Sequence, residues 1–355
     1  MGKVATETTL QELLSVAKSI AKFSADKSTW NALVNIGQSG NADSVLGIGD
    51  IITDTYTVDN DHVYDNIWVV VDFRDVIAYV NGIWVTYKNA PILQMLYTTH
   101  ESIAFDPRER EVATEATALA NTYYVGTNDN DTFTMIAYNE GDTINYAAYT
   151  YIYHSTWNST YPAHYGANAW ALSFARQYLN NEGTSYAVKQ HTYDVLPGTI
   201  SKGFKSLVSS DMINALHPIK VTTVRPSYMS GVDVSGTDDT YDTTTNTDVT
   251  KDMFWLLSVA DLNVYHSNAS ANDGTPMAYY KELLGVNASR TDGKQPQGTY
   301  AQLIKYAINA KTTAQYQWLR SANLGNNNEW NVNTSGNVNN NNPNNTNRFA
   351  PDWET

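Results

Sequence analysis

The chain has 355 residues, enough for one large domain or two ordinary ones, and 42% of them are hydrophobic, so it can fill a sizeable core. Only 16% are charged, and the formal net charge of −14 argues against nucleic acid and anionic membrane surfaces as partners, because both are negatively charged. No cysteine is present, which excludes disulfides, thiolate metal sites and a cysteine nucleophile.

The N-terminal part predicts a short helix followed by a linker. Apolar residues recur at helical spacing over residues 8–23, and the resulting stripe packs on its own domain or, alternatively, self-associates into a small bundle. The Gly- and Ser-rich stretch from Gly37 to Gly49 reads as a linker. This N-terminal stretch lacks the apolar core of a signal peptide, and no apolar run of about 18 residues spans a bilayer, so neither secretion by a visible signal nor membrane insertion is expected.

Antiparallel sheet is predicted next. Sequence patterns typical of β-strands cover residues 49–58, 67–80 and 82–88. The dipeptide Asn81-Gly82 predicts a hairpin turn between the last two strands. A loop or helix around 108–120 precedes another strand pair at 121–127 and 132–142. With 25 Tyr and many Thr and Val, the whole chain favours an α+β fold.

Helices and a long loop are predicted in the middle of the chain. Ala167–Leu179 reads as a helix with Trp170 and Phe174 on one face, and a second helical stretch covers Ser201–Leu216. Pro218 stops it before a strand at 219–224. Residues 225–251, rich in Gly, Asp, Ser and Thr, predict a long exposed loop, and the apolar block at 253–259 follows.

Catalytic and metal-binding motifs are not found in the sequence. No HExxH, GxSxG or phosphate-binding loop occurs, and we expect no enzymatic activity, no cofactor and no metal. An acidic cluster could hold calcium, although a solvated acidic loop is the simpler interpretation: Asp238, Asp239, Asp242 and Asp248. The histidines are scattered singly and predict structural or surface roles: His62, His100, His154, His164, His191, His217 and His266.

The most unusual segment is rich in asparagine. Fourteen of the twenty-five residues from 323 to 347 are Asn: Asn323, Asn326, Asn327, Asn328, Asn331, Asn333, Asn337, Asn339, Asn340, Asn341, Asn342, Asn344, Asn345 and Asn347. Asparagine runs are typical of disorder, but here core-type residues interrupt the run in alternation, and Ser335-Gly336 is a turn. We therefore predict a hairpin with Asn331, Asn333, Asn337 and Asn339 facing solvent.

An ordered frame is predicted to carry this asparagine surface. Its residues are Trp318, Leu319, Arg320, Trp330, Val332, Val338, Arg348, Phe349 and Trp353. The two arginines lie beside core residues in a charge-poor neighbourhood, where a guanidinium can donate to several carbonyl oxygens, so both are predicted to be structural. The aromatic and proline closure at the C-terminus predicts a locked end rather than a fraying tail.

The genetic code offers a reason for the use of asparagine at these positions. Its codons are AAC and AAT, and randomising only their adenines reaches most amino acids without creating a stop codon. Asparagine is thus a placeholder for diversity.

The pattern WLRSA, spaced Asn, W-x-V, SG-x-V and RFAPDW resembles the variable region of proteins diversified by diversity-generating retroelements. Such proteins are similar to phage tropism determinants, and the resemblance implies a C-type-lectin fold of the formylglycine-generating-enzyme type. Upstream, the chain resembles a domain family of gut bacteria and their phages. Four motifs carry this resemblance: GD at 49–50, the helix FARQYLNNE, and the blocks FWLLS and WLRS. The lack of cysteine excludes formylglycine-generating activity, and the many asparagines look like an unvaried template.

The resemblance implies a receptor-binding protein of a virion or bacterial cell surface. It implies an N-terminal helix and linker at 1–45 and a lectin-like domain at 46–355, with a variable region at 318–353 that displays the fourteen asparagines. The expected partner is a protein or glycan receptor on a bacterial cell, and a homo-oligomer such as a trimer stays open. Two alternatives remain: a structural virion or cell-surface component with a merely soluble Asn-rich end, and an enzyme acting on glycans through the acidic loop.

Overall fold

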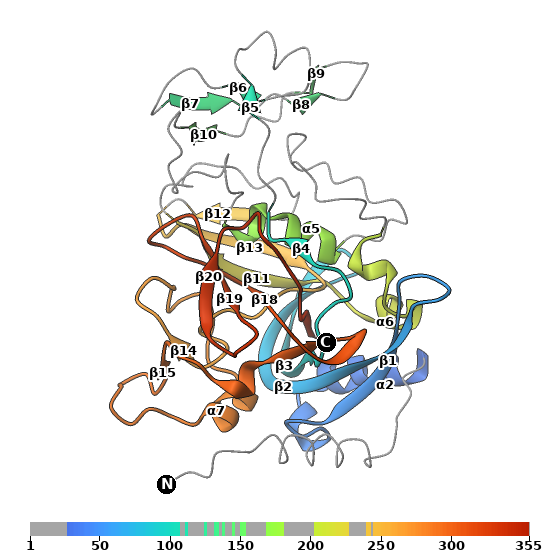
Figure 1. Ribbon diagram of the computed structural model, residues 1–355. Coiled ribbons are helices and arrows are strands. Elements are labelled where there is room, and N and C mark those ends of the chain that lie inside the picture. The colour runs from blue at the N-terminus through green and yellow to red at the C-terminus, as the bar shows by residue number, and fades with distance from the viewer. Residues whose placement is uncertain are drawn as a thin grey trace.

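The computed structural model describes residues 27–106, 168–180, 202–226, 239–242 and 244–354, and six short strands between 111 and 153 (Figure 1). The fold contains both helices and strands and is mostly β, which fits the α+β prediction. The predicted helix at 8–23 and the predicted loop or helix at 108–120 lie outside the described residues, apart from one short strand at Glu111–Val112.

A seven-stranded antiparallel sheet is the largest sheet of the described residues. Its order is β12-β13-β11-β2-β3-β22, and β1 pairs with β2. The bounds are β1 Ile51–Thr57, β2 Val63–Val80, β3 Ile83–Met95, β11 Ile219–Val224, β12 Thr240–Asp242, β13 Thr247–Asp252 and β22 Asp352–Glu354. The predicted turn at Asn81-Gly82 joins β2 to β3, with φ values of 50° and 87° that suit this dipeptide.

The C-terminus is built into this sheet. Strand β22 pairs with β3, so that Trp353 lies opposite Leu93. The Trp353 ring contacts Trp30 at 5.5 Å and Trp68 at 6.1 Å between ring centroids, and all three side chains are fully buried. The predicted locked C-terminus is confirmed.

A second, three-stranded antiparallel sheet carries the Asn-rich segment. It consists of β18 Gln317–Ala322, β19 Glu329–Val332 and β20 Val338–Asn341, with β19 in the centre. The hairpin predicted from NEWNVNTSGNVN is β19–β20, and Val332 lies opposite Val338. The remaining strands form pairs: β4 Ile103–Ala104 with β21 Thr346–Asn347, β5 Glu111–Val112 with β6 Tyr124–Val125, β7 Asp131–Thr134 with β10 Thr150–Tyr153, β8 Ala137–Tyr138 with β9 Ile144–Asn145, β14 Val264–Tyr265 with β15 Gln295–Pro296, and β16 Lys305–Ala307 with β17 Ala310–Gln315.

The helices are short. They are α2 Lys27–Gln38, α5 Phe174–Asn180, α6 Ser210–Ala215 and α7 Ala278–Leu284, with 3₁₀ turns η1 Ala42–Ser44, η2 Trp170–Leu172, η3 Phe204–Ser206 and η5 Ala301–Leu303. The helix predicted at 167–179 is η2 followed by α5. The stretch predicted at 201–216 divides into η3 and α6, because Ser209 caps α6 by accepting a bond from Met212 N at 3.1 Å.

Two predictions about loops are wrong. Gly37 lies inside α2, and Ala42 of the 3₁₀ turn η1 is buried, so the stretch predicted as a linker is partly helical. The loop predicted at 225–251 contains β12 and most of β13, and Asp248 is fully buried. Polar residues suggested a loop there because the sequence does not reveal that Arg225, also buried, neutralises Asp248 through Nε at 2.8 Å.

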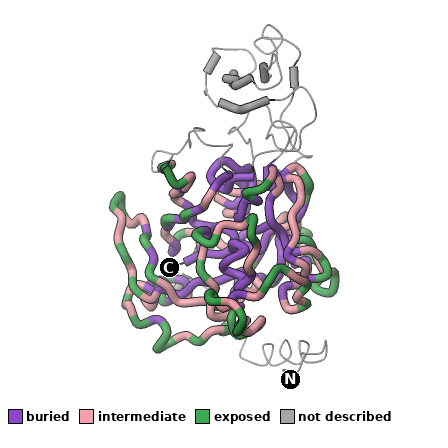
Figure 2. The backbone as a smooth tube through the Cα atoms, turned by 90° about the vertical axis from the view of Figure 1, so that its left-hand side faces the viewer, coloured by how far each residue is buried: buried purple, intermediate pink, exposed green. Residues whose placement is uncertain are grey.

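Buried residues occupy the middle of the described body, between the two sheets and the short helices (Figure 2). Six tryptophans are among the largest fully buried side chains: Trp30, Trp68, Trp170, Trp318, Trp330 and Trp353. Among the described residues, no helix combines the length and apolarity needed to cross a membrane.

Candidate ligand-binding face

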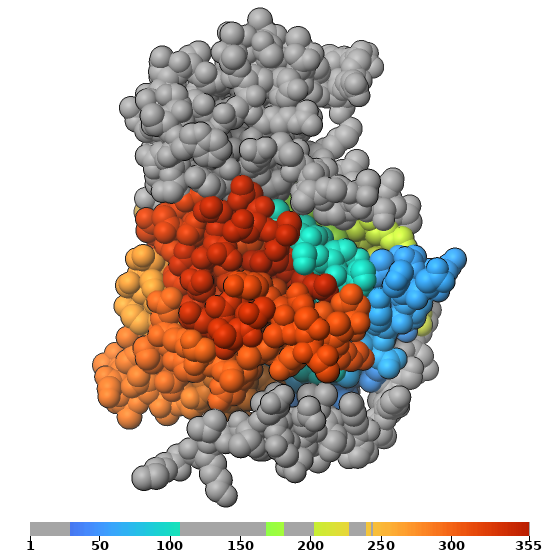
Figure 3. All heavy atoms as spheres, viewed as in Figure 1, coloured from blue at the N-terminus to red at the C-terminus, as the bar shows by residue number. Residues whose placement is uncertain are grey.

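The C-terminal residues that include the Asn-rich segment gather on one face of the molecule (Figure 3). Beneath them, every residue of β18 and β19 is buried, whereas Asn339, Asn340 and Asn341 of β20 are partly exposed. Strand β20 forms one edge of its sheet. Within this sheet, the partly exposed asparagines therefore lie on the edge strand.

The predicted apolar frame of the variable region is confirmed. Its members are all at most 2% exposed: Trp318, Leu319, Trp330, Val332, Val338, Phe349 and Trp353. Trp318 donates through Nε1 to the carbonyl oxygen of Ile103 at 3.1 Å, and its ring contacts Phe105. The frame thus ties β18 to the segment around β4.

Arg320 is a buried structural residue. Its guanidinium donates to Asp261 Oδ2 at 2.7 Å and to the carbonyl oxygen of Leu256 at 2.6 Å, and it also binds the carbonyl oxygen of Asp273. Burial by itself raises the pKa of Asp261, but the Arg320 and Arg74 guanidinium groups outweigh it and hold this pKa below its usual value. Arg320 therefore fixes β18 to the segment from Leu256 to Asp273.

Arg348 joins three chain segments. Its guanidinium donates to the carbonyl oxygen of Thr99 at 2.6 Å and to Asn309 Oδ1 at 3.1 Å. Its backbone carbonyl accepts from Trp318 N at 3.0 Å. These contacts anchor the partly exposed Arg348 in the fold, and its structural role stays a prediction.

Four of the predicted display residues do not face solvent. Asn323, Asn327, Asn331 and Asn347 are at most 6% exposed. The prediction assumed that alternation places Asn331 outside because Trp330 and Val332 lie inside. Both faces of β19 are covered, so alternation along this strand does not separate buried from exposed residues.

Three asparagines, one of them the buried Asn323, hold the backbone in turns. Asn323 Oδ1 accepts from Gly325 N at 2.9 Å, and Asn326 Oδ1 accepts from Asn328 N at 2.9 Å. Asn333 Oδ1 accepts from Ser335 N, Ser335 Oγ and Asn337 N between 2.8 and 3.0 Å. These are the local side-chain bonds by which asparagine stabilises turns.

The remaining display positions follow one another along β20 and the loop after it. All are partly or fully exposed, and we call them the outer row: Asn337, Asn339, Asn340, Asn341, Asn342, Asn344 and Asn345. The last predicted position, Asn328, is partly exposed and donates to Asn340 Oδ1 at 2.6 Å. The row contains no charged residue, so its surface offers amide donors and acceptors.

Sequence reasoning missed the residue that organises the neighbouring loop. Asn168 is fully buried, and its Nδ2 lies 3.3, 3.0 and 2.8 Å from the carbonyl oxygens of Asn323, Asn326 and Asn328. Its only signal in the sequence is a lone Asn in an otherwise apolar stretch beside Trp170. Another missed neighbour is His266, whose ring lies 4.3 Å from Trp330.

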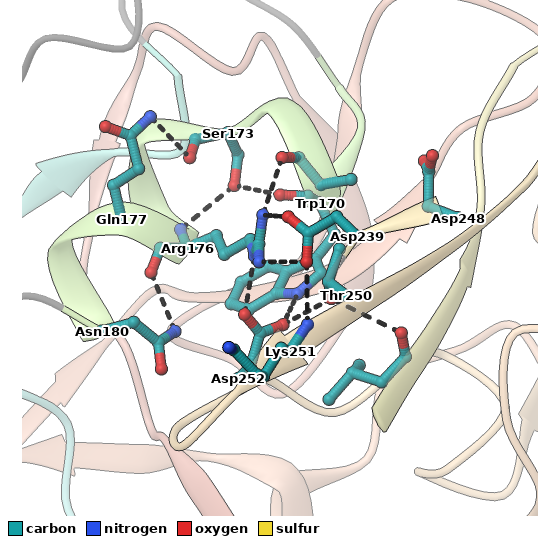
Figure 4. A network of polar contacts seen from close by, with 12 residues as sticks. Trp170, Ser173, Arg176, Gln177, Asn180, Asp239, Asp248, Thr250, Lys251 and Asp252 are labelled. Atoms are coloured by element: carbon teal, nitrogen blue, oxygen red, sulfur yellow. Dashed lines mark hydrogen bonds and ion pairs between the residues drawn. The ribbon is translucent and has the colours of Figure 1, made fainter. Parts of the chain in front are cut away.

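The acidic residues considered for calcium have other partners. Arg176 of α5 donates to Asp239 Oδ2 at 2.8 Å and to Asp252 Oδ1 at 2.6 Å, and Trp170 Nε1 donates to Asp252 Oδ2 at 2.8 Å (Figure 4). The Asp239 side chain is buried and paired with Arg176. It therefore fits neither the predicted solvated loop nor a calcium ligand exposed on that loop. Asp242 is exposed and caps its own turn through Thr244 N and Thr245 Oγ1, and Asp238 lies outside the described residues.

The four histidines that the structure describes do not form a cluster with metal-binding geometry. His62 contacts the exposed Asp59 on its own loop and lies near His100, while His217 and His266 lie elsewhere. His154, His164 and His191 fall outside the described residues. In the part of the chain that the structure describes, no three His, Asp or Glu residues are placed to hold a metal ion.

Comparison with known proteins assigns the chain to a family. No curated protein and no solved structure matches it. One family model, a domain of unknown function (DUF6273), matches residues 148–349, which is more than half of the chain and includes the three-stranded sheet and the outer row. The protein is therefore a member of the DUF6273 family.

Proposed function

We propose that the protein is a hypervariable ligand-binding protein, the target of a diversity-generating retroelement, and that its ligand face is the outer row. One observation carries the proposal: the asparagine repeat belongs to an ordered sheet whose apolar residues are buried, while the asparagines of the outer row stay partly or fully exposed. Disorder would not produce this separation.

We further propose that the fold is of the C-type-lectin and formylglycine-generating-enzyme type. Contacts among the elements that carry the resemblance support this. Asn180 of FARQYLN accepts bonds from Met253 N and Phe254 N at 2.7 and 3.1 Å, next to the FWLLS block. Arg320 of WLRS donates to Leu256 inside FWLLS, so the separate motifs belong to one packed unit.

The proposed partner is a protein or glycan receptor on a bacterial cell, and the proposed location is a virion or a bacterial surface. An uncharged amide surface supports this partner class because it hydrogen-bonds without imposing a charge. Asparagine supplies adaptable bonds but few strong anchors, which Tyr, Trp or Arg supply in paratopes. Varied versions of the face are therefore expected to bind more tightly than the asparagine version.

The competing function is a structural component without a diversified site. The asparagines that are buried or that hold turns favour it, because these positions serve the fold. The two functions differ in what the outer row tolerates: a binding face accepts many residues there, whereas a structural asparagine network does not.

A pair of matched libraries tests the proposal. The first randomises the adenines in the codons of the outer row, and the second does so for the turn-holding Asn323, Asn326 and Asn333. Both are sorted for protease-resistant protein and then for binding to purified bacterial surface glycans and proteins. We expect most of the first library to fold and some members to bind, whereas much of the second unfolds; general unfolding of the first library would contradict the proposal.

The gene neighbourhood gives an independent test. A retroelement target is expected beside a reverse-transcriptase gene and a near-copy of the stretch that encodes Trp318 to Trp353. Sister genes that vary evenly along their length, with neither neighbour, would favour the structural component.

A further inference from the structure

Beneath the outer row, a five-residue segment buries polar atoms that have no partner. The side chains of Asn327, Glu329 and Asn331 are at most 1% exposed. All six of their nitrogen and oxygen atoms lack a hydrogen-bond partner. Native proteins rarely leave such groups unsatisfied, so each one lowers stability and calls for an explanation.

The register places part of this segment directly against the outer row. Asn331 lies opposite Asn339, and Glu329 lies opposite Asn341, across the β19–β20 pair. Residues directly opposite in an antiparallel pair share a face of the sheet and contact each other. On the other flank, Asn331 lies opposite Trp318 of β18. A change of side chain at 331 therefore shifts Asn339 relative to a rigid neighbour.

The buried asparagines fall into two kinds. Asn323 is 2% exposed and accepts a bond from Gly325 N, so the fold uses its amide. Asn327 and Asn331 are buried as deeply, but their amides contribute no bond. Nothing in the described structure requires asparagine at 327 or 331.

We infer that Asn327 and Asn331 are buried members of the variable set that do not contact ligand, and that Asn331 shapes the outer row from within the protein. The inference rests on the proposed function, since it assigns these two buried asparagines to the diversified set. Asn331 is a positioning residue: it acts on specificity through Asn339, which lies opposite it across the strand pair.

A stability experiment tests the first half of the inference without any ligand. Asn327→Leu and Asn331→Leu replace an unbonded amide with an apolar group of similar size, and Asn331→Val offers a smaller, strand-favouring alternative should leucine overpack the site. Asn323→Leu and Asn333→Leu are matched controls that remove bonded amides. Thermal unfolding of the full chain is the measurement.

We expect the midpoint temperature of unfolding to rise or stay level for Asn327→Leu and for at least one of Asn331→Leu and Asn331→Val. For both control variants we expect it to fall. A fall at 327 and in both 331 variants, as large as in the controls, would overturn the inference, because it would show that the fold depends on these amides. The outer-row library does not vary 327 or 331, so its success or failure is a separate result.

A binding experiment tests the positioning role. A library that varies 327, 331 and the outer row together is sorted against one purified test protein, streptavidin. In the binders obtained, reverting only 331 to Asn is expected to weaken affinity several-fold while the protein stays folded, because Asn339 shifts. Unchanged affinity in every reverted binder would overturn the positioning role and leave 331 as a mere core position.

Discussion

The Asn-rich segment consists of two regions with the same composition and different roles. From Asn323 to Asn333, the asparagine side chains other than that of Asn328 accept bonds from backbone nitrogens or are buried. From Asn337 to Asn345, they are partly or fully exposed along β20 and the next loop. Composition alone therefore does not decide what an asparagine does: the position of its strand within the sheet does.

The largest effect is expected from the frame beneath both regions. Arg320→Ala leaves the fully buried Asp261 without its close partner at 2.7 Å, and breaking a buried ion pair in this way costs about 3–5 kcal/mol of unfolding free energy. Chemical denaturation measures it. Arg320→Lys, which keeps the charge, should lose less. Unchanged stability with lost binding would instead assign Arg320 to the ligand.

A smaller loss of stability is expected from a substitution at Asn168, which supports only the region from Asn323 to Asn333. Asn168→Ala removes the amide that faces three carbonyl oxygens of the loop from Asn323 to Asn328, and removing the partner of such buried groups costs about 1–3 kcal/mol. Hydrogen exchange should increase at Gly325 and Asn328, whose amides are bonded in this loop, more than along β20. Equal increases in both regions would show that the loop and β20 open together.

Arg348→Ala is expected to have an intermediate effect at the other end of the segment. It removes hydrogen bonds from a half-buried side chain to Thr99 and Asn309. The free energy of unfolding should therefore fall by about 1–2 kcal/mol. Thermal unfolding measures the loss. An unchanged melting temperature together with weaker binding in a selected variant would place Arg348 in the ligand face.

The pH dependence of stability tests the buried acids around the frame. Burial raises the pKa of Glu354 to about 8 and that of Asp273 to about 7. Their contribution is fully present below their unfolded pKa values near 4, and it is lost as pH rises toward 8, because the unfolded chain ionises first. The protein should therefore be more stable at pH 5 than at pH 8, and Glu354→Gln should flatten the profile. A rising profile would contradict the assignment.

The sequence predicted those features that depend on local pattern. Strands β1 to β3, the Asn81-Gly82 turn, the stop at Pro218 and the buried positions Trp330, Val332 and Val338 all follow from alternation and turn chemistry. Apolar residues at period two are buried whatever lies on the other side of the strand, so their prediction was reliable.

Features that depend on distant partners could not be predicted in this way. Asp252 bonds to Arg176, which is 76 residues away, and Asn168 faces a loop more than 150 residues away. Without knowledge of these partners, polar residues were assigned to loops or to solvent. Asn331 was misassigned for a related reason: alternation identifies an exposed face only when one side of the strand is solvated, and β19 is covered on both.

The smallest effect is also the most direct test of the difference between the two regions. Two triple variants are compared by thermal and chemical unfolding: Asn339→Ala, Asn341→Ala and Asn345→Ala in the outer row, against Asn323→Ala, Asn326→Ala and Asn333→Ala in the turns. Each exposed change should stay within about 0.5 kcal/mol. Each turn change should cost about 1 kcal/mol, because a bond to the backbone is lost. The outer triple is predicted to unfold like the unchanged protein; if it loses as much stability as the turn triple, the outer row is structural and is not a ligand face.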